Sequence, residues 1–268
     1  MNMKLFWRED GNPHGPPVLL AHAFPTSHAI WDWQIAALGK RYRLIRPDIR
    51  GFGQSPVSPP TYSMEDIAAD LINLLDHLEL DSVNFIGVSM GGMVGQVLSL
   101  NYPERVRSLA LCMTTSVVPA DTPLGDDPAY SICARLMKAA SERAYKQGMS
   151  PIITMCMDRW FTETFQLSSQ AKKISAIIGR NSPTGYHGGV EAMCGFDVTE
   201  QLHKIRQPTL VMPGALDKAT PPRCSDVIVA HIPDSKLQVI DGVKHIGIVE
   251  RPDPCNAHLL AHLDAFAN

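Results

Sequence analysis

The fold is decided by residues 83–92, VNFIGVSMGG, in which an apolar run ends in the motif Gly87-Val88-Ser89-Met90-Gly91. The apolar run predicts a buried strand, and the residues from Met90 to Asn101 have a helical pattern that stops before a proline. A serine on a sharp turn between a strand and a helix has a strained backbone, and side chains two positions away would collide with both elements. Because the motif arises by chance in such a chain with a probability of about 0.1, its placement is the stronger signal.

Short apolar runs alternate with helical patterns on both sides of this stretch. Further strands are expected at Val18–Ala21, Arg43–Arg46, Ser108–Cys112, Thr209–Met212 and Leu237–Ile240. A helix is expected after Ser63, with Asp66 placed to complete a capping box. The alternation predicts an α/β fold with a mostly parallel central sheet flanked by helices.

The alternation stops at about Val117 and returns at about Gln207. Helical stretches at 132–144, 151–161 and 171–178 fill the interval without a clear strand run. A helical segment of roughly ninety residues between two strands of one sheet predicts a lid rather than a separate domain. We therefore expect a core of residues 1–116 and 208–268, with a helical lid of residues 117–207 inserted after the sixth strand.

Composition limits the partners. The 268 residues carry 24 basic and 27 acidic side chains, which favours a small-molecule substrate over nucleic acid or a membrane surface. No signal-peptide pattern or apolar run of spanning length occurs, so we expect the whole chain to be the mature protein, in the cytoplasm. Six scattered cysteines without a CxxC pair indicate neither a disulfide framework nor a metal site, and no Gly-rich phosphate loop indicates a nucleotide. The expectation is therefore no cofactor and no metal, and homo-oligomerisation stays open.

Two residues are candidates for activating Ser89. A serine hydroxyl needs a base to take its proton, and the base needs a carboxylate that fixes its tautomer. Asp217 and His245 each follow a predicted strand, which gives the chain order Ser, Asp, His. Asp241 and Asp121 are weaker rivals for the acid, because the first sits four residues before His245 and the second lies at the lid entrance.

Attack on a carbonyl produces an oxyanion that needs two donors. One candidate is the backbone N–H of Met90, at the positive end of the helix after Ser89. The other is the N–H of Phe24 in the loop His22-Ala23-Phe24-Pro25, where His22 is interpreted as organising the loop. In the loop Arg50-Gly51-Phe52-Gly53, the glycines permit a tight turn and Arg50 is interpreted as an anchor, with substrate contact as the alternative.

Five segments carry a resemblance to a known family. They are Ile30–Leu38, Asp48–Ser55, the Gly87–Gly91 motif, Arg159–Thr162 and Gly214–Pro222. Nearly the whole chain resembles the α/β-hydrolase superfamily, and within it the 3-oxoadipate enol-lactonases and their esterase relatives. A serine at the motif argues against the dehalogenases and epoxide hydrolases of the superfamily, which use a carboxylate there. Ala23-Phe24-Pro25 departs from the small Ser-Leu-Gly type sequence of enol-lactonases and looks more like the loop of cofactor-free esterases and perhydrolases.

The expected lid offers material for a substrate pocket. Its methionines and aromatic residues suit either an adaptable apolar pocket or a small core of the lid itself: Met137, Met149, Met155, Met157, Met193, Phe161 and Phe165. By the resemblance and by its place in the lid, Trp160 is expected to face the ligand. The lid cations either pair with a carboxylate on an acidic lactone or are solvated: Arg135, Arg143, Arg159, Lys172, Lys173 and Arg180.

These observations predict a serine hydrolase that cleaves a small carboxylic ester or lactone through an acyl-enzyme. Three alternatives keep the same residues. They are a cofactor-free perhydrolase or haloperoxidase-like enzyme, a hydrolase of carbon–carbon bonds, and a ligand receptor with slow turnover. The fold alone does not choose among them.

Overall fold

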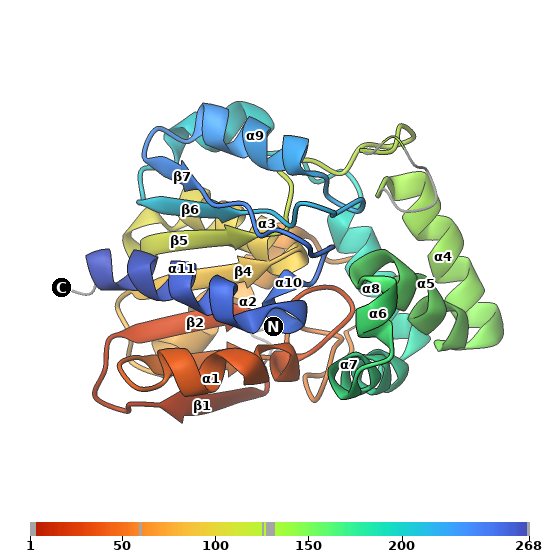
Figure 1. Ribbon diagram of the computed structural model, residues 1–268, viewed down its shortest axis with the longest axis horizontal. Helices are drawn as coiled ribbons and strands as arrows, with labels where there is room; N and C mark the ends of the chain where they lie inside the picture. Colours follow the sequence, from red (N-terminus) through yellow and green to blue (C-terminus); the bar gives the residue numbers. More distant parts are fainter. Residues whose placement is uncertain (1–3, 59–60, 125, 127–131, 267–268) are drawn as a thin grey trace.

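A seven-stranded sheet in the order β1-β3-β2-β4-β5-β6-β7 organises the computed structural model, which describes residues 4–58, 61–124, 126 and 132–266 (Figure 1). The strands are β1 (Trp7–Gly11), β2 (Pro17–Ala21), β3 (Arg43–Pro47), β4 (Val83–Val88), β5 (Val106–Cys112), β6 (Thr209–Met212) and β7 (Ser235–Leu237). β1 runs antiparallel to β3, and every other neighbouring pair in this sheet is parallel. The predicted α/β fold with a mostly parallel sheet is therefore confirmed.

The register of the central strands places their carboxyl ends along one edge. Ala21 lies opposite Gly87, and Cys112 lies opposite both Val88 and Met212. All six residues of β4 are buried, as expected for a parallel strand covered on both faces. The loops after β2, β4, β5 and β6 consequently begin at the same edge, which is where ligands bind in open parallel sheets.

Helices cover both faces of the sheet. The core helices are α1 (Asp32–Leu38), α2 (Met64–His77), α3 (Met90–Asn101), α9 (Pro222–His231), α10 (Gly247–Glu250) and α11 (Pro252–Ala265), with the short 3-10 helices η1 (His28–Trp31), η2 (Pro103–Arg105) and η3 (Thr199–Lys204). α1 packs against α11 on the near face in Figure 1, and α2 packs against α3 on the far face. The expected capping box of Ser63 and Asp66 begins α2 and is confirmed.

A helical insertion separates β5 from β6 and lies at the carboxyl edge of the sheet (Figure 1). It contains α4 (Ala134–Gln147), α5 (Ser150–Trp160), α6 (Glu163–Gln166), α7 (Ser169–Gly179) and α8 (Pro183–Met193). Its two ends lie side by side, because Val117 pairs with Asp197 in an isolated bridge. The insertion was expected after a sixth strand. Among the described residues it follows the fifth strand, β5, because a single strand, β1, precedes the first parallel strand, β2.

Several elements differ from the expectation, which included neither strand β1 nor helices α1, α8 and α9. Helix α8 was missed because its three glycines lower helix propensity, although Ser182 caps it and Pro183 begins it. Tertiary packing overrides the propensity, since a Cβ on Gly185 would lie 2.1 Å from the carbonyl oxygen of Gly51. The last strand spans Ser235–Leu237 instead of Leu237–Ile240, because Ile240 makes only an isolated bridge to Gly214.

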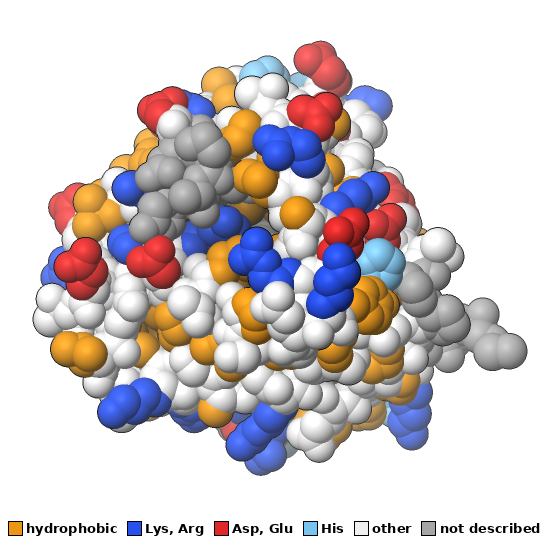
Figure 2. All heavy atoms as spheres, turned by 90° about the vertical axis from the view of Figure 1, so that its right-hand side faces the viewer, with side chains coloured by type: hydrophobic (Ala, Val, Ile, Leu, Met, Phe, Trp, Pro, Cys, Tyr) orange, Lys and Arg blue, Asp and Glu red, His pale blue; other side chains and the backbone are white. Residues whose placement is uncertain are grey.

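Cationic and anionic side chains are interspersed over the face formed by the insertion (Figure 2). Among the described residues, no helix combines the length and the apolarity that crossing a bilayer requires. The same residues contain no group of three or more His, Cys, Asp or Glu side chains placed to hold a metal ion.

Candidate active site

Ser89 stands on the turn between β4 and α3, at the carboxyl edge of the sheet. Its backbone has φ 55° and ψ −117°, a strained conformation for a residue with a side chain. The turn depends on the two glycines of the motif. A Cβ on Gly87 would lie 2.2 Å from the carbonyl oxygen of Gly91, and a Cβ on Gly91 would lie 2.2 Å from that of Ala21. The close approach of these backbones thus explains why Gly-x-Ser-x-Gly forms here.

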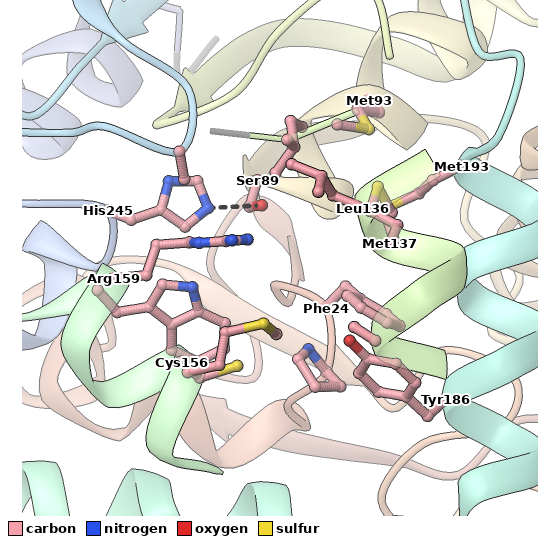
Figure 3. Close-up of a pocket in the computed structure, with 16 residues that line it drawn as sticks. Phe24, Ser89, Met93, Leu136, Met137, Cys156, Arg159, Tyr186, Met193 and His245 are labelled. Atoms are coloured by element: carbon pink, nitrogen blue, oxygen red, sulfur yellow. Dashed lines mark hydrogen bonds between the residues drawn. The ribbon is translucent and has the colours of Figure 1, made fainter. Parts of the chain in front are cut away.

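Ser89, His245 and Asp217 form an unbroken chain of hydrogen bonds. His245 Nε2 lies 2.8 Å from Ser89 Oγ, and His245 Nδ1 lies 2.7 Å from Asp217 Oδ2 (Figure 3 shows the first contact). An ionised carboxylate only accepts hydrogen bonds, so Nδ1 carries the proton and Nε2 presents its lone pair to the serine hydroxyl. All three side chains are buried. The structure therefore brings together the three residues that the sequence singled out.

Asp217 is held by its own turn. Its Oδ1 accepts the N–H groups of Ala219 (2.8 Å) and Thr220 (3.1 Å), which is the geometry of an Asx turn. Its Oδ2 accepts the Thr220 hydroxyl at 2.9 Å in addition to the His245 N–H. The carboxylate is consequently fixed from both oxygens.

The rival acids are placed elsewhere. The Asp121 side chain is 81% exposed and lies 3.9 Å from the guanidinium of Arg135. Asp241 is exposed, and its carbonyl oxygen accepts a hydrogen bond from Arg251. The carboxylate that contacts His245 is that of Asp217.

The loop after β2 contributes Phe24 to the pocket that Ser89 lines, and α3 begins at Met90, directly after Ser89. Among the described residues, the N–H groups of Phe24 and Met90 have no hydrogen-bond acceptor. His22 supports the loop, because its Nδ1–H donates to the Ala23 carbonyl (2.9 Å) and its Nε2 accepts the N–H of Ile49 (2.9 Å). Burial lowers the pKa of His22, which keeps the ring neutral in this role. The interpretation of His22 as a loop-organising residue agrees with these contacts.

The neighbouring loop is anchored as expected. Arg50 Nε lies 2.5 Å from Asp70 Oδ2 on α2, and its guanidinium lies over the ring of Tyr62 at 5.0 Å. The anchoring interpretation of Arg50 is confirmed.

A pocket opens above Ser89 between the sheet edge and the insertion (Figure 3). Its lining from the insertion includes Met137, Met155, Cys156, Arg159, Trp160 and Met193. The Trp160 ring lies 6.3 Å from the His245 ring, centroid to centroid, so the expected position of Trp160 at the pocket agrees with the structure. Of the six cations in the insertion that were candidates for a substrate carboxylate, Arg159 lines this pocket. Burial raises the pKa of the Cys156 thiol to about 12, so this cysteine is not a competing nucleophile.

A family model described as the alpha/beta hydrolase fold matches residues 16–252. The chain belongs to this family. 3-Oxoadipate enol-lactonase 2 of Acinetobacter baylyi is 31% identical over 258 residues, which are 96% of this chain and 91% of that protein. A thermophilic esterase of Thermogutta terrifontis superposes with a TM-score of 0.88 at 29% identity, covering 99% of this chain and 95% of that one. The enol-lactonase of Burkholderia xenovorans LB400 does so with a TM-score of 0.89 at 26% identity, covering 98% and 97%.

Within this α/β hydrolase, sequence reasoning missed several residues of the site, among them Thr220, Met93 and Tyr186. Thr220 follows Asp217 closely, and its signal was the Asp-x-x-Thr spacing of an Asx turn. Met93 lies one helical turn after Ser89, and Tyr186 lies on the unpredicted helix α8. The family and the relatives support a hydrolase, and the pocket residues from α4, α5 and α8 form the wall opposite Ser89.

Proposed function

We propose that this chain is a serine hydrolase that cleaves a small carboxylic ester or lactone through an acyl-enzyme intermediate. The observation that carries the proposal is the hydrogen-bonded chain from Ser89 through His245 to Asp217, buried beneath a pocket. The imidazole lies between the hydroxyl and the carboxylate, at hydrogen-bond distance from each. This is the arrangement in which an imidazole and a carboxylate make a serine hydroxyl nucleophilic. The resemblance to an enol-lactonase and an esterase favours an ester or lactone as substrate.

In the first half-reaction, the Ser89 oxygen attacks the substrate carbonyl while His245 Nε2 takes the serine proton. Asp217 stabilises the imidazolium that results, because its Oδ2 accepts the Nδ1–H. The tetrahedral intermediate collapses when the carbon–oxygen bond to the leaving group breaks and Nε2 returns the proton to the leaving oxygen. The acyl group is then bonded to Ser89, and the freed alcohol or enol departs or, from a lactone, stays attached to the acyl chain.

In the second half-reaction, water attacks the acyl-enzyme while His245 accepts one of its protons. The serine oxygen leaves with that proton, which restores the resting state and releases the carboxylic acid. The N–H groups of Phe24 and Met90 are the proposed donors to the oxyanion in both half-reactions. Helix α3 adds the positive end of its dipole at Met90.

The residues around this machinery fit a small substrate. Trp160 forms the pocket wall beside His245 and is the proposed substrate contact. We assign residues 117–207 the role of a lid over the core of residues 1–116 and 208–268, because the insertion supplies most of the apolar lining.

The test is hydrolysis of 4-nitrophenyl acetate and of a small lactone by the wild type, Ser89→Ala and His245→Gln. Each variant is expected to lose turnover by about 10⁴-fold or more while keeping the wild-type circular dichroism spectrum. Undiminished turnover in Ser89→Ala would contradict the proposal. Wild-type turnover slower than about one event per hour would instead favour a ligand receptor.

Hydrogen peroxide is a second nucleophile that the same residues would accept in place of water. Phe24 and Pro25 both line the pocket at Ser89, which favours this candidate because their loop looks like that of perhydrolases. Peroxide-dependent halogenation that disappears in Ser89→Ala would support perhydrolysis as a side activity. Ester hydrolysis without any halogenation would exclude it.

A further inference from the structure

We infer that the hydroxyl of Tyr186 donates a hydrogen bond to an uncharged oxygen on the acyl group of the substrate. The substrate class that follows is an ester or lactone whose acyl chain carries a hydroxyl or ether oxygen besides the carboxyl group that is cleaved. The inference rests on the proposed function and adds a polar requirement on the acyl side of the substrate.

The Tyr186 hydroxyl has no hydrogen-bond partner among the described residues. Tyr186 is 2% exposed and lines the pocket above Ser89, and the hydrogen bond that it makes is that of its backbone N–H to the Ser182 carbonyl oxygen. A buried hydroxyl without a partner is unfavourable, because it has lost its hydrogen bonds to water. Burial raises the pKa of Tyr186, so the hydroxyl keeps its proton and can donate it to a hydrogen bond.

The hydroxyl belongs to the acyl side of the pocket. Figure 3 shows the Tyr186 side chain extending from α8 with its oxygen directed into the pocket, and it places Tyr186 and His245 on opposite sides. His245 Nε2 returns its proton to the leaving oxygen, so the leaving group lies next to His245 and the acyl group points away. The acyl chain therefore extends toward Tyr186.

The position of Tyr186 is fixed relative to the loop after β2. The backbone of α8 lies close to this loop, since a Cβ on Gly189 would lie 2.7 Å from the Phe24 ring. The Phe24 and Tyr186 rings pack at 4.6 Å between centroids, and the Asn181 side-chain amide, just before α8, donates to the Pro25 carbonyl oxygen at 3.0 Å. Because the Phe24 N–H is a proposed donor to the oxyanion, the Tyr186 hydroxyl is held at a set distance from the carbonyl under attack, as a specificity residue requires.

The surroundings of the hydroxyl indicate an uncharged oxygen. Figure 3 shows Phe24, Leu136, Met137 and Met193 on the same side of the pocket as Tyr186. Thioether, aliphatic and aromatic side chains favour an apolar acyl chain. A single hydroxyl satisfies one ether or hydroxyl oxygen on that chain, whereas a carboxylate has two oxygens and a charge that one neutral donor does not compensate.

Paired 4-nitrophenyl esters locate this oxygen along the acyl chain. Each pair replaces one methylene by an ether oxygen: methoxyacetate against butyrate, 3-methoxypropanoate against pentanoate, and 4-methoxybutanoate against hexanoate. The members of a pair have nearly the same shape and the same leaving group, so they differ in one hydrogen-bond acceptor. The ether preference is the ratio of their kcat/KM values, each divided by the rate of hydroxide hydrolysis.

Tyr186→Phe removes the hydroxyl and retains the ring. At the chain position that faces the hydroxyl, the ether preference should be roughly fivefold higher in the wild type than in Tyr186→Phe, and at the other positions the two enzymes should agree. Because the hydroxyl has no partner among the described residues, the urea midpoint of Tyr186→Phe should not fall below that of the wild type. Tyr145→Phe is the matched control, since Tyr145 is 50% exposed on α4 and outside the pocket lining, and its ether preferences should equal those of the wild type.

The outcomes separate this inference from the proposed function. Equal ether preferences in the wild type and Tyr186→Phe at all three positions would overturn the role of Tyr186 and leave the serine hydrolase intact. A lower urea midpoint in Tyr186→Phe would show that the hydroxyl bonds within the protein, and labelling of Ser89 by phenylmethylsulfonyl fluoride without hydrolysis of any ester would exclude the inferred acyl site; either result would also overturn the inference. Absence of both hydrolysis and labelling would refute the serine hydrolase and the inference with it.

Discussion

Replacing Thr220 by Val tests how the acid beside His245 is held in place. The Thr220 hydroxyl donates to Asp217 Oδ2 at 2.9 Å, and the side chain is 1% exposed, so water does not replace the lost donor. A hydrogen bond to a charged group contributes about 1.5–3 kcal/mol. Because two backbone N–H groups still hold Asp217 Oδ1, we take the lower value. A loss of about 1.5 kcal/mol corresponds to a decrease in kcat/KM of roughly tenfold.

The assay is kcat/KM for 4-nitrophenyl acetate in the wild type, Thr220→Val and Thr220→Ser, with the circular dichroism spectrum as the check on folding. Without the Thr220 hydroxyl, Asp217 Oδ2 loses the donor that fixes it beside the His245 Nδ1–H, so the imidazole that takes the Ser89 proton is held less firmly. Thr220→Ser retains the hydroxyl and should behave as the wild type. A Thr220→Val enzyme with wild-type kcat/KM would refute this reasoning.

Three further predictions concern the frame around the site. Gly91→Ala should lower the free energy of unfolding in urea by about 3 kcal/mol, because its Cβ would lie 2.2 Å from the Ala21 carbonyl oxygen; wild-type stability would contradict this. Burial lowers the pKa of His262 from 6.5 to about 4, so the unfolded chain binds the proton more tightly than the folded one. The free energy of unfolding should therefore fall by on the order of 2 kcal/mol as the pH is lowered from about 6.5 to 4, and His262→Leu should remove this pH dependence. An equal pH dependence in the wild type and in His262→Leu would contradict the prediction. Cys156, whose pKa burial raises to about 12, should resist iodoacetamide at about pH 8 in the folded protein, and rapid alkylation of its peptide would show otherwise.

The parts of the fold that follow from local pattern were predictable from the sequence. Apolar runs bounded by turns gave the parallel strands, and Ser63 with Asp66 gave the start of α2. The strand-to-helix setting of Ser89 then implied a base and an acid after later strands, because those strands end at the same edge of the sheet.

The parts that depend on contacts between distant segments were not predictable. Helix α8 forms despite its glycines because Gly185 packs against the loop at Gly51, 134 positions earlier in the chain. Of the six candidate cations of the insertion, Arg159 lines the pocket. Its position likewise depends on distant contacts, because Lys244 Nζ donates to the Asp158 carbonyl oxygen and the Ile246 N–H donates to that of Trp160. Periodicity contains no information on either contact.

The most direct test of the central claim is mass spectrometry of the protein quenched with acid during turnover of 4-nitrophenyl acetate. A serine hydrolase should show one added acetyl group on the peptide that contains Ser89, and none in Ser89→Ala. Ester turnover that continues in Ser89→Ala, with no acetyl group on that peptide of the wild type, would contradict the account.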